Sequence, residues 1–218
     1  MEQNKKLDVK KLVLLAVFTA LAYTVVCLIR VPAADFLSYE PKDVIIVIGG
    51  LIFGPLASLI IAFVTALLEM VTISDTGPIG AVMNLLSSSC YACTAAFVYK
   101  HKRTLSGAVT GLTVGSIAMV TVMLLWNWLI TPLYMGVSRE AVAGMLVPMF
   151  LPFNAVKALL NSALVLCLYK PLSTALRRAR LISTPTTTEG SFKIGIYILS
   201  VVVLATGILM LLVLQGKI

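Results

Sequence analysis

The segment MFLPFNAVKALLNSALVLCLY at 149–169 decides the fold class. It is long and apolar enough for one transmembrane helix, which needs about 20 residues. Within it, Asn154, Lys157 and Asn161 are spaced by three and then four residues, so they share one face of a helix. A lysine at membrane depth is costly and usually faces a partner or a cavity. This helix therefore carries the first candidate site.

Two interpretations of these polar residues remain open from the sequence. Lys157 lies about 8 Å along the helix axis from Pro152, so its ammonium group would also reach the membrane surface by extending along the helix. Asn154 would equally serve to bond one helix to another, and the same holds for Asn84 and Asn127 in other apolar segments.

The rest of the chain is equally apolar. Of its 218 residues, 60% are hydrophobic and 12% are charged, and the mean hydropathy is +1.03. These values predict an all-α polytopic membrane protein without a separate soluble domain. The net charge of +8 comes from short basic clusters between apolar runs. Such clusters are typical of topology determinants and do not indicate nucleic-acid binding.

The basic clusters set the expected topology. By the positive-inside rule they should all face the cytoplasm, and they lie at 5–11, 100–103 and 170–180. The segment 43–72 must then cross twice or not at all, and two short crossings that reverse at Gly54-Pro55 fit best. The expected spans are 11–29, the two crossings in 43–72, 78–99, 105–133 and 149–169.

These spans form a six-helix core over residues 1–180, with a cytoplasmic N-terminus and a first helix that is retained, not removed as a signal. A polar, turn-rich linker at 181–193 separates this core from a last apolar segment at 194–214. We interpret that segment as an appended seventh helix, which would leave the C-terminus outside.

Acidic and aromatic residues complete the expected topology. The outer loops collect Asp35, Glu40, Asp43, Asp75 and Glu140. Glu69 is interpreted as a solvated helix end, not as a proton carrier. Trp126 and Trp128 fit an interfacial belt better than a pair of ligand-stacking rings.

Small residues four positions apart mark helix faces that allow close packing, as at Gly107, Gly111 and Gly115.

No catalytic or metal site is predicted. The one histidine, His101, lies in a basic cluster, and the CxxC of Cys90 and Cys93 has no second cysteine pair or histidine beside it. The nucleotide-binding pattern GxxxxGK followed by Ser or Thr is absent, so any uphill transport takes its energy from elsewhere. Amides and an ammonium at similar depth suit a heterocycle that carries carbonyl and ring-nitrogen acceptors.

Five sequence blocks occur in an order that resembles one known family. They are FLSYEPKDV at 36–44, IGGLIFGPLA at 48–57, GPIG at 77–80 followed by Asn84, the region from Asn127 to Tyr134, and FLPFNAVK at 150–157. Together, over about residues 8–180, they resemble the riboflavin-specific S component of energy-coupling factor (ECF) vitamin transporters.

The resemblance implies a bacterial cell-membrane subunit that is not an enzyme and has no cofactor. It would capture riboflavin, or FMN and related flavins, in an outward-facing pocket beneath the loop between its first two helices. It would then associate with a transmembrane coupling protein and two cytoplasmic ATPase subunits.

The resemblance also implies roles for individual residues. Contacts to the isoalloxazine ring would come from Asn127, Asn154 and Lys157, and Leu37, Glu40 and Gly80 would lie near the ligand. Ala16 and Ala20 occupy the AxxxA positions that pack on the coupling protein. The chain departs from the pattern at Ile61–Ala66, where many relatives carry charged and amide residues, and in its seventh segment.

Other functions stay open from the sequence. An ion-gradient-driven carrier would need Glu40 or Glu69 as its coupling acid, and an S component for a different vitamin would keep the same fold. A carrier built from inverted repeats should show two broken helices, whereas this chain has a single Gly/Pro-interrupted segment. A membrane enzyme or scaffold is disfavoured because catalytic residues are missing.

Overall fold

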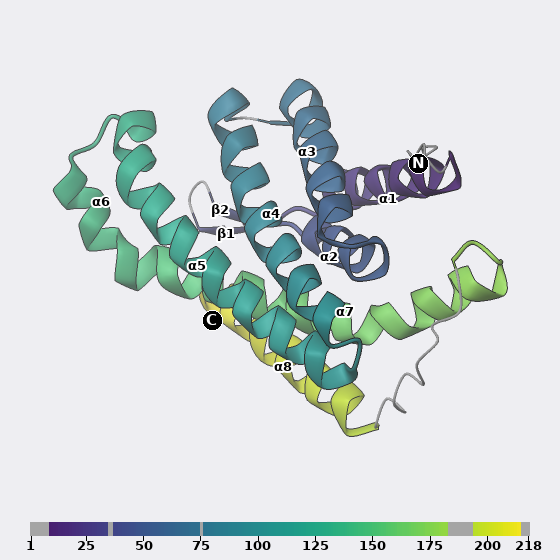
Figure 1. The fold of residues 1–218 in the computed structure, drawn as a ribbon. Helices are drawn as coiled ribbons and strands as arrows, with labels where there is room; N and C mark the ends of the chain where they lie inside the picture. Colours follow the sequence, from purple (N-terminus) through teal and green to yellow (C-terminus); the bar gives the residue numbers. More distant parts are fainter. Residues whose placement is uncertain (1–8, 35–36, 75, 183–193, 215–218) are drawn as a thin grey trace.

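The computed structural model describes residues 9–34, 37–74, 76–182 and 194–214. Its described part is a bundle of helices with one short β-hairpin inserted after the first helix (Figure 1). The elements in order are α1 (Val9–Leu28), β1 (Val31–Ala34), β2 (Leu37–Tyr39), α2 (Lys42–Phe53), α3 (Pro55–Thr72), α4 (Gly77–His101), α5 (Leu105–Met135), α6 (Arg139–Met145), the π-helix η1 (Leu146–Phe150), α7 (Leu151–Arg178) and α8 (Ile194–Leu214).

Within the described ranges, five helical stretches before α8 are long and apolar enough to cross a membrane. They are α1, α3, α4, α5 and the continuous run from α6 through η1 to α7. This arrangement confirms the predicted all-α membrane fold. The helices extend beyond the predicted spans, because α5 continues to Met135 and α6 begins at Arg139, ahead of the span predicted from about residue 149. The hydroxyl of Ser138 starts α6 by accepting a hydrogen bond from the amide of Ala141 at 3.2 Å.

The predicted chain reversal at Gly54-Pro55 is confirmed. Gly54 has φ +99°, a conformation that favours glycine, and Pro55 opens α3 at a position where its missing N–H costs nothing. Lys42 at the start of α2 pairs with Glu69 near the end of α3, so the two helices are antiparallel. With 12 residues, of which nine are buried, α2 lies inside the bundle and is not exposed to lipid along its length.

The glycine face of α5 packs directly on α4. A Cβ atom on Gly111 would lie 2.7 Å from the carbonyl oxygen of Ala95, and one on Gly115 would lie 2.7 Å from that of Tyr91. Both distances are shorter than real Cβ contacts. The predicted small-residue face therefore serves packing within the chain. By contrast, Ala16 on α1 is exposed.

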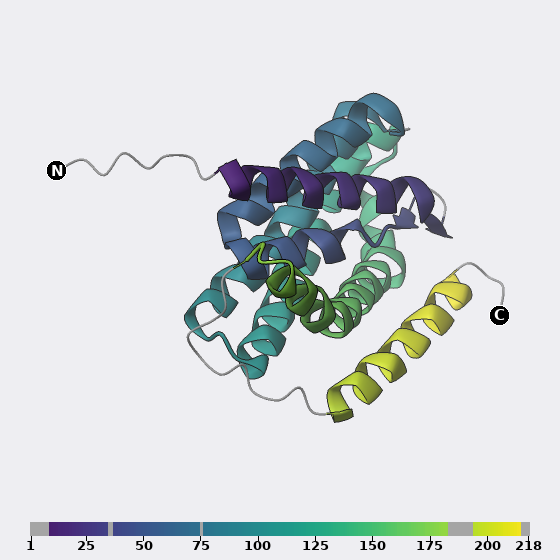
Figure 2. The same ribbon diagram turned by 90° about the vertical axis from the view of Figure 1, so that its right-hand side faces the viewer.

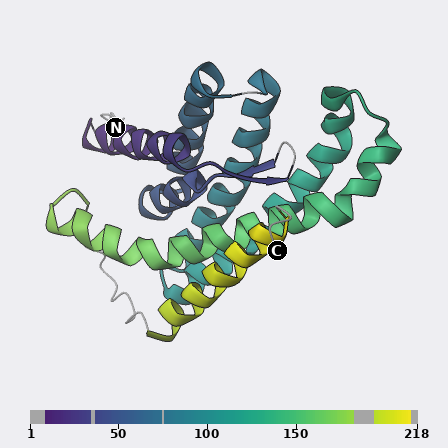
Figure 3. The same ribbon diagram turned by 180° about the vertical axis from the view of Figure 1, so that it is seen from behind.

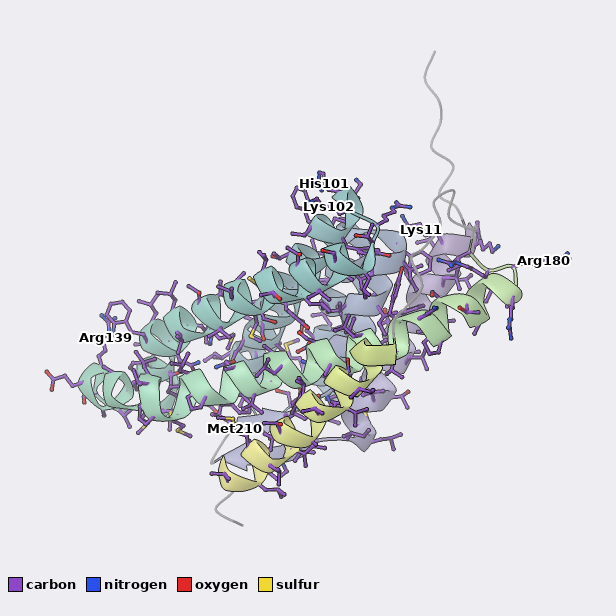
Figure 4. All side chains as sticks on the ribbon, turned by 90° about the horizontal axis from the view of Figure 1, so that it is seen from below. Lys11, His101, Lys102, Arg139, Arg180 and Met210 are labelled. Atoms are coloured by element: carbon purple, nitrogen blue, oxygen red, sulfur yellow. The ribbon has the colours of Figure 1, made fainter. Side chains whose placement is uncertain are left out.

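Charged side chains separate along the length of the bundle. Lys11, His101, Lys102 and Arg180 lie toward one end, whereas Arg139 lies toward the opposite end (Figure 4). This separation agrees with the predicted gathering of the basic clusters on one side of the membrane.

The appended segment forms α8, which packs along α7 (Figures 2 and 3). Gly207 of α8 faces Leu160 of α7, and Leu211 joins a buried cluster that includes Ala33 of β1. The C-terminal half of α8 therefore lies beside the hairpin. Most of the predicted linker, residues 183–193, lies outside the described part of the chain.

Candidate ligand-binding site

A cavity of about 70 Å³ lies beneath the β-hairpin, between α3, α4, α5 and α7. Six of the residues predicted from the sequence line it: Leu37, Glu40, Asn84, Asn127, Asn154 and Lys157. Gly80 is not among the lining residues. It is buried in the first turn of α4, against the side chain of Thr76, which does line the cavity.

Lys157 is held within the bundle by an ion pair. Its ammonium nitrogen lies 3.2 Å from Oδ2 of Asp43, in the first turn of α2, and only 8% of its side chain is exposed. The interpretation that Lys157 extends to the membrane surface is therefore wrong. The pair compensates two charges that would each be costly in isolation.

Further hydrogen bonds fix Asp43 in place. Ser88 donates to Oδ1 of Asp43, and the Asn161 amide donates to Oδ2 at 3.4 Å. The hydroxyl of Tyr39 donates to Oδ1 of Asn161 at 3.0 Å. Burial, followed by the charge of Asp43, raises the pKa of this hydroxyl, so it stays protonated as the donor. These bonds connect the hairpin to α2, α4 and α7.

A second charged network joins the cavity-lining residues Arg30, Glu40 and Glu69 through Lys42. The ammonium group of Lys42 contacts Glu40 at 2.7 Å and Glu69 at 2.5 Å, and Arg30 lies 3.3 Å from Glu40. Asn84 of α4 donates to Glu69 of α3 at 3.0 Å. Asn84 therefore bonds one helix to another, which is one of the two roles left open for it, and it also lines the cavity.

The placement of Asp43 in an outer loop and of Glu69 at a solvated helix end was wrong. Lys42 and Asp43 open α2 and are each 1% exposed, and Glu69 is 3% exposed. They remain buried because each has a partner of opposite charge on another element. The sequence held a signal for Glu69, which is the one charged residue between 44 and 74 and so resembles Lys157 in its apolar setting.

Asn127 and Asn154 hydrogen-bond to their own helices. Asn127 donates to the carbonyl of Met123 at 2.7 Å, and Asn154 donates to that of Phe150 at 2.8 Å. Both residues are almost completely buried and line the cavity. Asn161 of α7, by contrast, bonds other elements through Tyr39 and Asp43.

The two tryptophans lie outside the cavity lining. Trp126 packs on the core, and Trp128 is 42% exposed. Exposure of Trp128 agrees with the preferred interpretation as an interfacial residue.

Comparison with known proteins matches this chain to one family. The model of the family described as "ECF transporter, substrate-specific component" matches residues 10–169. The riboflavin transporter RibU of Staphylococcus aureus (strain TCH60) is 29% identical over 187 residues, which cover 82% of this chain and 95% of that protein. The riboflavin transporter FmnP of Bacillus subtilis (strain 168) is 28% identical over 165 residues, covering 70% and 86%.

A solved structure has the same fold. It is described as the S component of a bacterial ECF transporter, has 29% sequence identity and a TM-score of 0.66, and covers 78% of this chain and 98% of that one. The family match spans most of the six-helix region and all the cavity-lining residues. The chain therefore belongs to the substrate-specific components of ECF transporters.

Proposed function

We propose that this protein captures riboflavin in the cavity beneath the β-hairpin and delivers it to a separate ATP-driven coupling module. The observation that supports this proposal most is that Asn127 of α5 lines the same buried cavity as Asn154 and Lys157 of α7. Similarity to two proteins named as riboflavin transporters supports the choice of ligand.

The cavity wall fits the chemistry of an isoalloxazine ring. The ring offers carbonyl and ring-nitrogen acceptors and one imide N–H donor. Asn127 and Asn154 each carry both a donor and an acceptor, and Lys157 adds a positively charged donor. Met123 and Phe153 supply apolar surface in the same wall. Few placed polar groups in an otherwise apolar pocket are typical of ligand sites.

Binding requires the cavity to widen. Sites for ligands of this size are on the order of 300–1,000 Å³, whereas the cavity here measures about 70 Å³. The lining side chains must therefore move apart when the flavin enters. The Asp43–Lys157 pair keeps the ammonium group directed toward this region in the absence of ligand.

Delivery would rely on other subunits. The chain has no P-loop sequence, so a transmembrane coupling protein and two cytoplasmic ATPase subunits would supply ATP hydrolysis. Ala16 and Ala20 on α1 are exposed, and their small side chains would let a partner helix approach closely. We assign this face to the coupling protein.

The orientation follows from charge. The basic end of the bundle would face the cytoplasm of a bacterial cell, with the N-terminus on that side and the hairpin facing outward. With α8 spanning the bilayer, the C-terminus would lie outside.

Ion-driven transport is the weaker alternative. Its coupling acid would be Glu40 or Glu69, and both carboxylates contact Lys42. Protonation of either one would reduce the compensation of a buried ammonium group, which is costly.

Titration of the purified full-length protein tests the ligand assignment. Riboflavin should bind one-to-one without ATP and lose its fluorescence, with a dissociation constant in the nanomolar range, about −12 kcal/mol. Saturation by a different vitamin, with no quenching at micromolar riboflavin, would reject riboflavin and keep the architecture. Uptake by this chain alone in ATP-free proteoliposomes would favour the carrier.

A further inference from the structure

The two carboxylate oxygens of Glu69 differ in their hydrogen bonding. Its Oε2 accepts hydrogen bonds from Lys42 at 2.5 Å and from Asn84 at 3.0 Å. Its Oε1 is buried and has no hydrogen-bond partner among the residues that the structure describes. Glu69 is 3% exposed and lines the cavity. The end of α3 thus offers a charged acceptor beside the cavity.

A buried acceptor without a partner is unfavourable, and a donor that reaches it removes that cost. Rotation of the carboxylate would break the contacts of Lys42 and Asn84 with Oε2. A donor brought by the ligand is therefore the natural partner for Oε1. Charge-assisted hydrogen bonds of this kind are about twice as strong as neutral ones.

The surroundings of Glu69 suit a chain of hydroxyl groups. Ser74, Thr76 and Ser87 line the cavity from the α3–α4 connection and from α4. The amides assigned to the flavin ring come from α5 and α7 instead. Apart from the residues that come from the hairpin region, the polar lining therefore has two parts, and the α3–α4 part combines one carboxylate with several hydroxyls.

Charges in the lining are balanced for a neutral ligand. Arg30 and Lys157 are cationic, and Glu40 and Glu69 are anionic. Each of these cations already pairs with a carboxylate, Arg30 with Glu40 and Lys157 with Asp43. A phosphate placed near Glu69 would add repulsion without an unpaired cation to offset it.

We propose that Glu69 is a specificity-determining residue whose Oε1 accepts a hydrogen bond from a hydroxyl of the ligand's polyol chain and whose charge disfavours a phosphorylated chain. This inference rests on the proposed function, since it assumes a flavin in this cavity. It assigns the ring to the α5–α7 side and the polyol to the α3–α4 side.

Three ligands and one isosteric substitution test it with purified full-length protein. Riboflavin carries the polyol, lumiflavin replaces the polyol with a methyl group, and FMN adds a terminal phosphate. In Glu69→Gln, the amide oxygen should stay on Lys42 and Asn84, which are donors, and the NH₂ group should face the cavity. We expect riboflavin to bind about tenfold more weakly, lumiflavin affinity to change less than about twofold, and FMN to gain about tenfold relative to riboflavin.

Two further variants sharpen the result. Glu69→Asp keeps the charge but withdraws the carboxylate by one methylene, so riboflavin should lose its advantage over lumiflavin while FMN stays disfavoured. This variant also carries the test if Glu69→Gln does not fold. Glu140→Gln removes an exposed acidic group on α6 and should leave all three affinities unchanged.

Equal changes for riboflavin and lumiflavin, or no change for either, would overturn the role of Glu69. An unchanged ratio of FMN to riboflavin affinity in Glu69→Gln would overturn the charge effect. Failure of the wild-type protein to bind both riboflavin and lumiflavin would instead reject the proposed function. The two hypotheses therefore fail in different measurements.

Discussion

Lys157 of α7 and Asp43 of α2 form a buried ion pair, with 3.2 Å between the ammonium nitrogen and Oδ2. The two residues lie far apart in the sequence, and their pairing holds the helix with the ring-binding candidates against the helix that follows the hairpin. Because Lys157 also lines the cavity, one residue takes part in both the packing of the fold and the candidate site.

Removal of Lys157 should therefore lower both stability and affinity. Lys157→Ala leaves Asp43 without its countercharge, which should lower the free energy of unfolding by roughly 3 kcal/mol or more. It should also weaken riboflavin binding by about 1–3 kcal/mol. Thermal unfolding in detergent and fluorescence titration measure the two effects.

The double variant Asp43→Asn, Lys157→Met separates them. With both charges gone, thermal stability should largely recover, while affinity stays low because the charged donor is missing. His101→Ala, at the exposed basic end, should change neither property. Wild-type affinity in the double variant would show that Lys157 makes no contact with the ligand.

Asn154 and Asn161 should behave differently although they share α7. Asn154 bonds its own helix and lines the cavity, so Asn154→Ala should cost about 1–3 kcal/mol of binding with little loss of stability. Asn161 bonds Tyr39 and Asp43. Asn161→Ala should lower the unfolding temperature more than Asn154→Ala does. If Asn161→Ala weakened riboflavin binding more than Asn154→Ala does, the ligand would lie deeper in the bundle.

Docking on the coupling module should depend on α1. Replacing both Ala16 and Ala20 with Trp should abolish co-purification with the module and ATP-dependent uptake, because bulky side chains would hold the partner helix away. Riboflavin affinity in detergent should stay within about 0.5 kcal/mol, as for distant independent sites. The control replaces Ile117 and Leu125, exposed on α5, with Trp. Normal uptake in the Ala16/Ala20 variant would reject α1 as the docking face.

Cysteine labelling should establish the orientation. In a background without the four native cysteines, single cysteines at Ser106 and Ala179 should react only from the cytoplasm, and one at Ser138 only from outside. All three positions are exposed. A cysteine at Lys217 should label from outside, because α8 has 21 residues and is long enough to span. Cytoplasmic labelling there would mean that α8 does not cross.

The contact between Gly207 and Leu160 predicts how α8 is held. A Cβ atom on Gly207 would lie 2.5 Å from Cδ2 of Leu160. Gly207→Leu should therefore separate α8 from α7 and lower the free energy of unfolding by about 1–3 kcal/mol. Gly195→Leu is the matched control, since no atoms within 4 Å would meet the new side chain. Equal melting temperatures in the two variants would show that α8 contributes little to the fold.

The sequence determined what depends on local pattern. Hydrophobic length predicted the spanning helices and α8, and Gly54-Pro55 predicted the chain reversal, because these signals act within one segment. The spacing of Asn154 and Lys157 placed both on one helix face, and both line the cavity. The ordered sequence blocks indicated the family without any tertiary information.

Only the tertiary structure decided which charges are buried and with which partners. Lys42, Asp43 and Glu69 stand at helix ends, where the sequence pattern fits solvated residues as well as buried ones. Their burial depends on a countercharge delivered by another element, and the chain order carries no signal for the pairing of Asp43 with Lys157. Packing also left Oε1 of Glu69 without a hydrogen-bond partner among the described residues. Such pairings depend on how helices meet in three dimensions, which local periodicity does not encode.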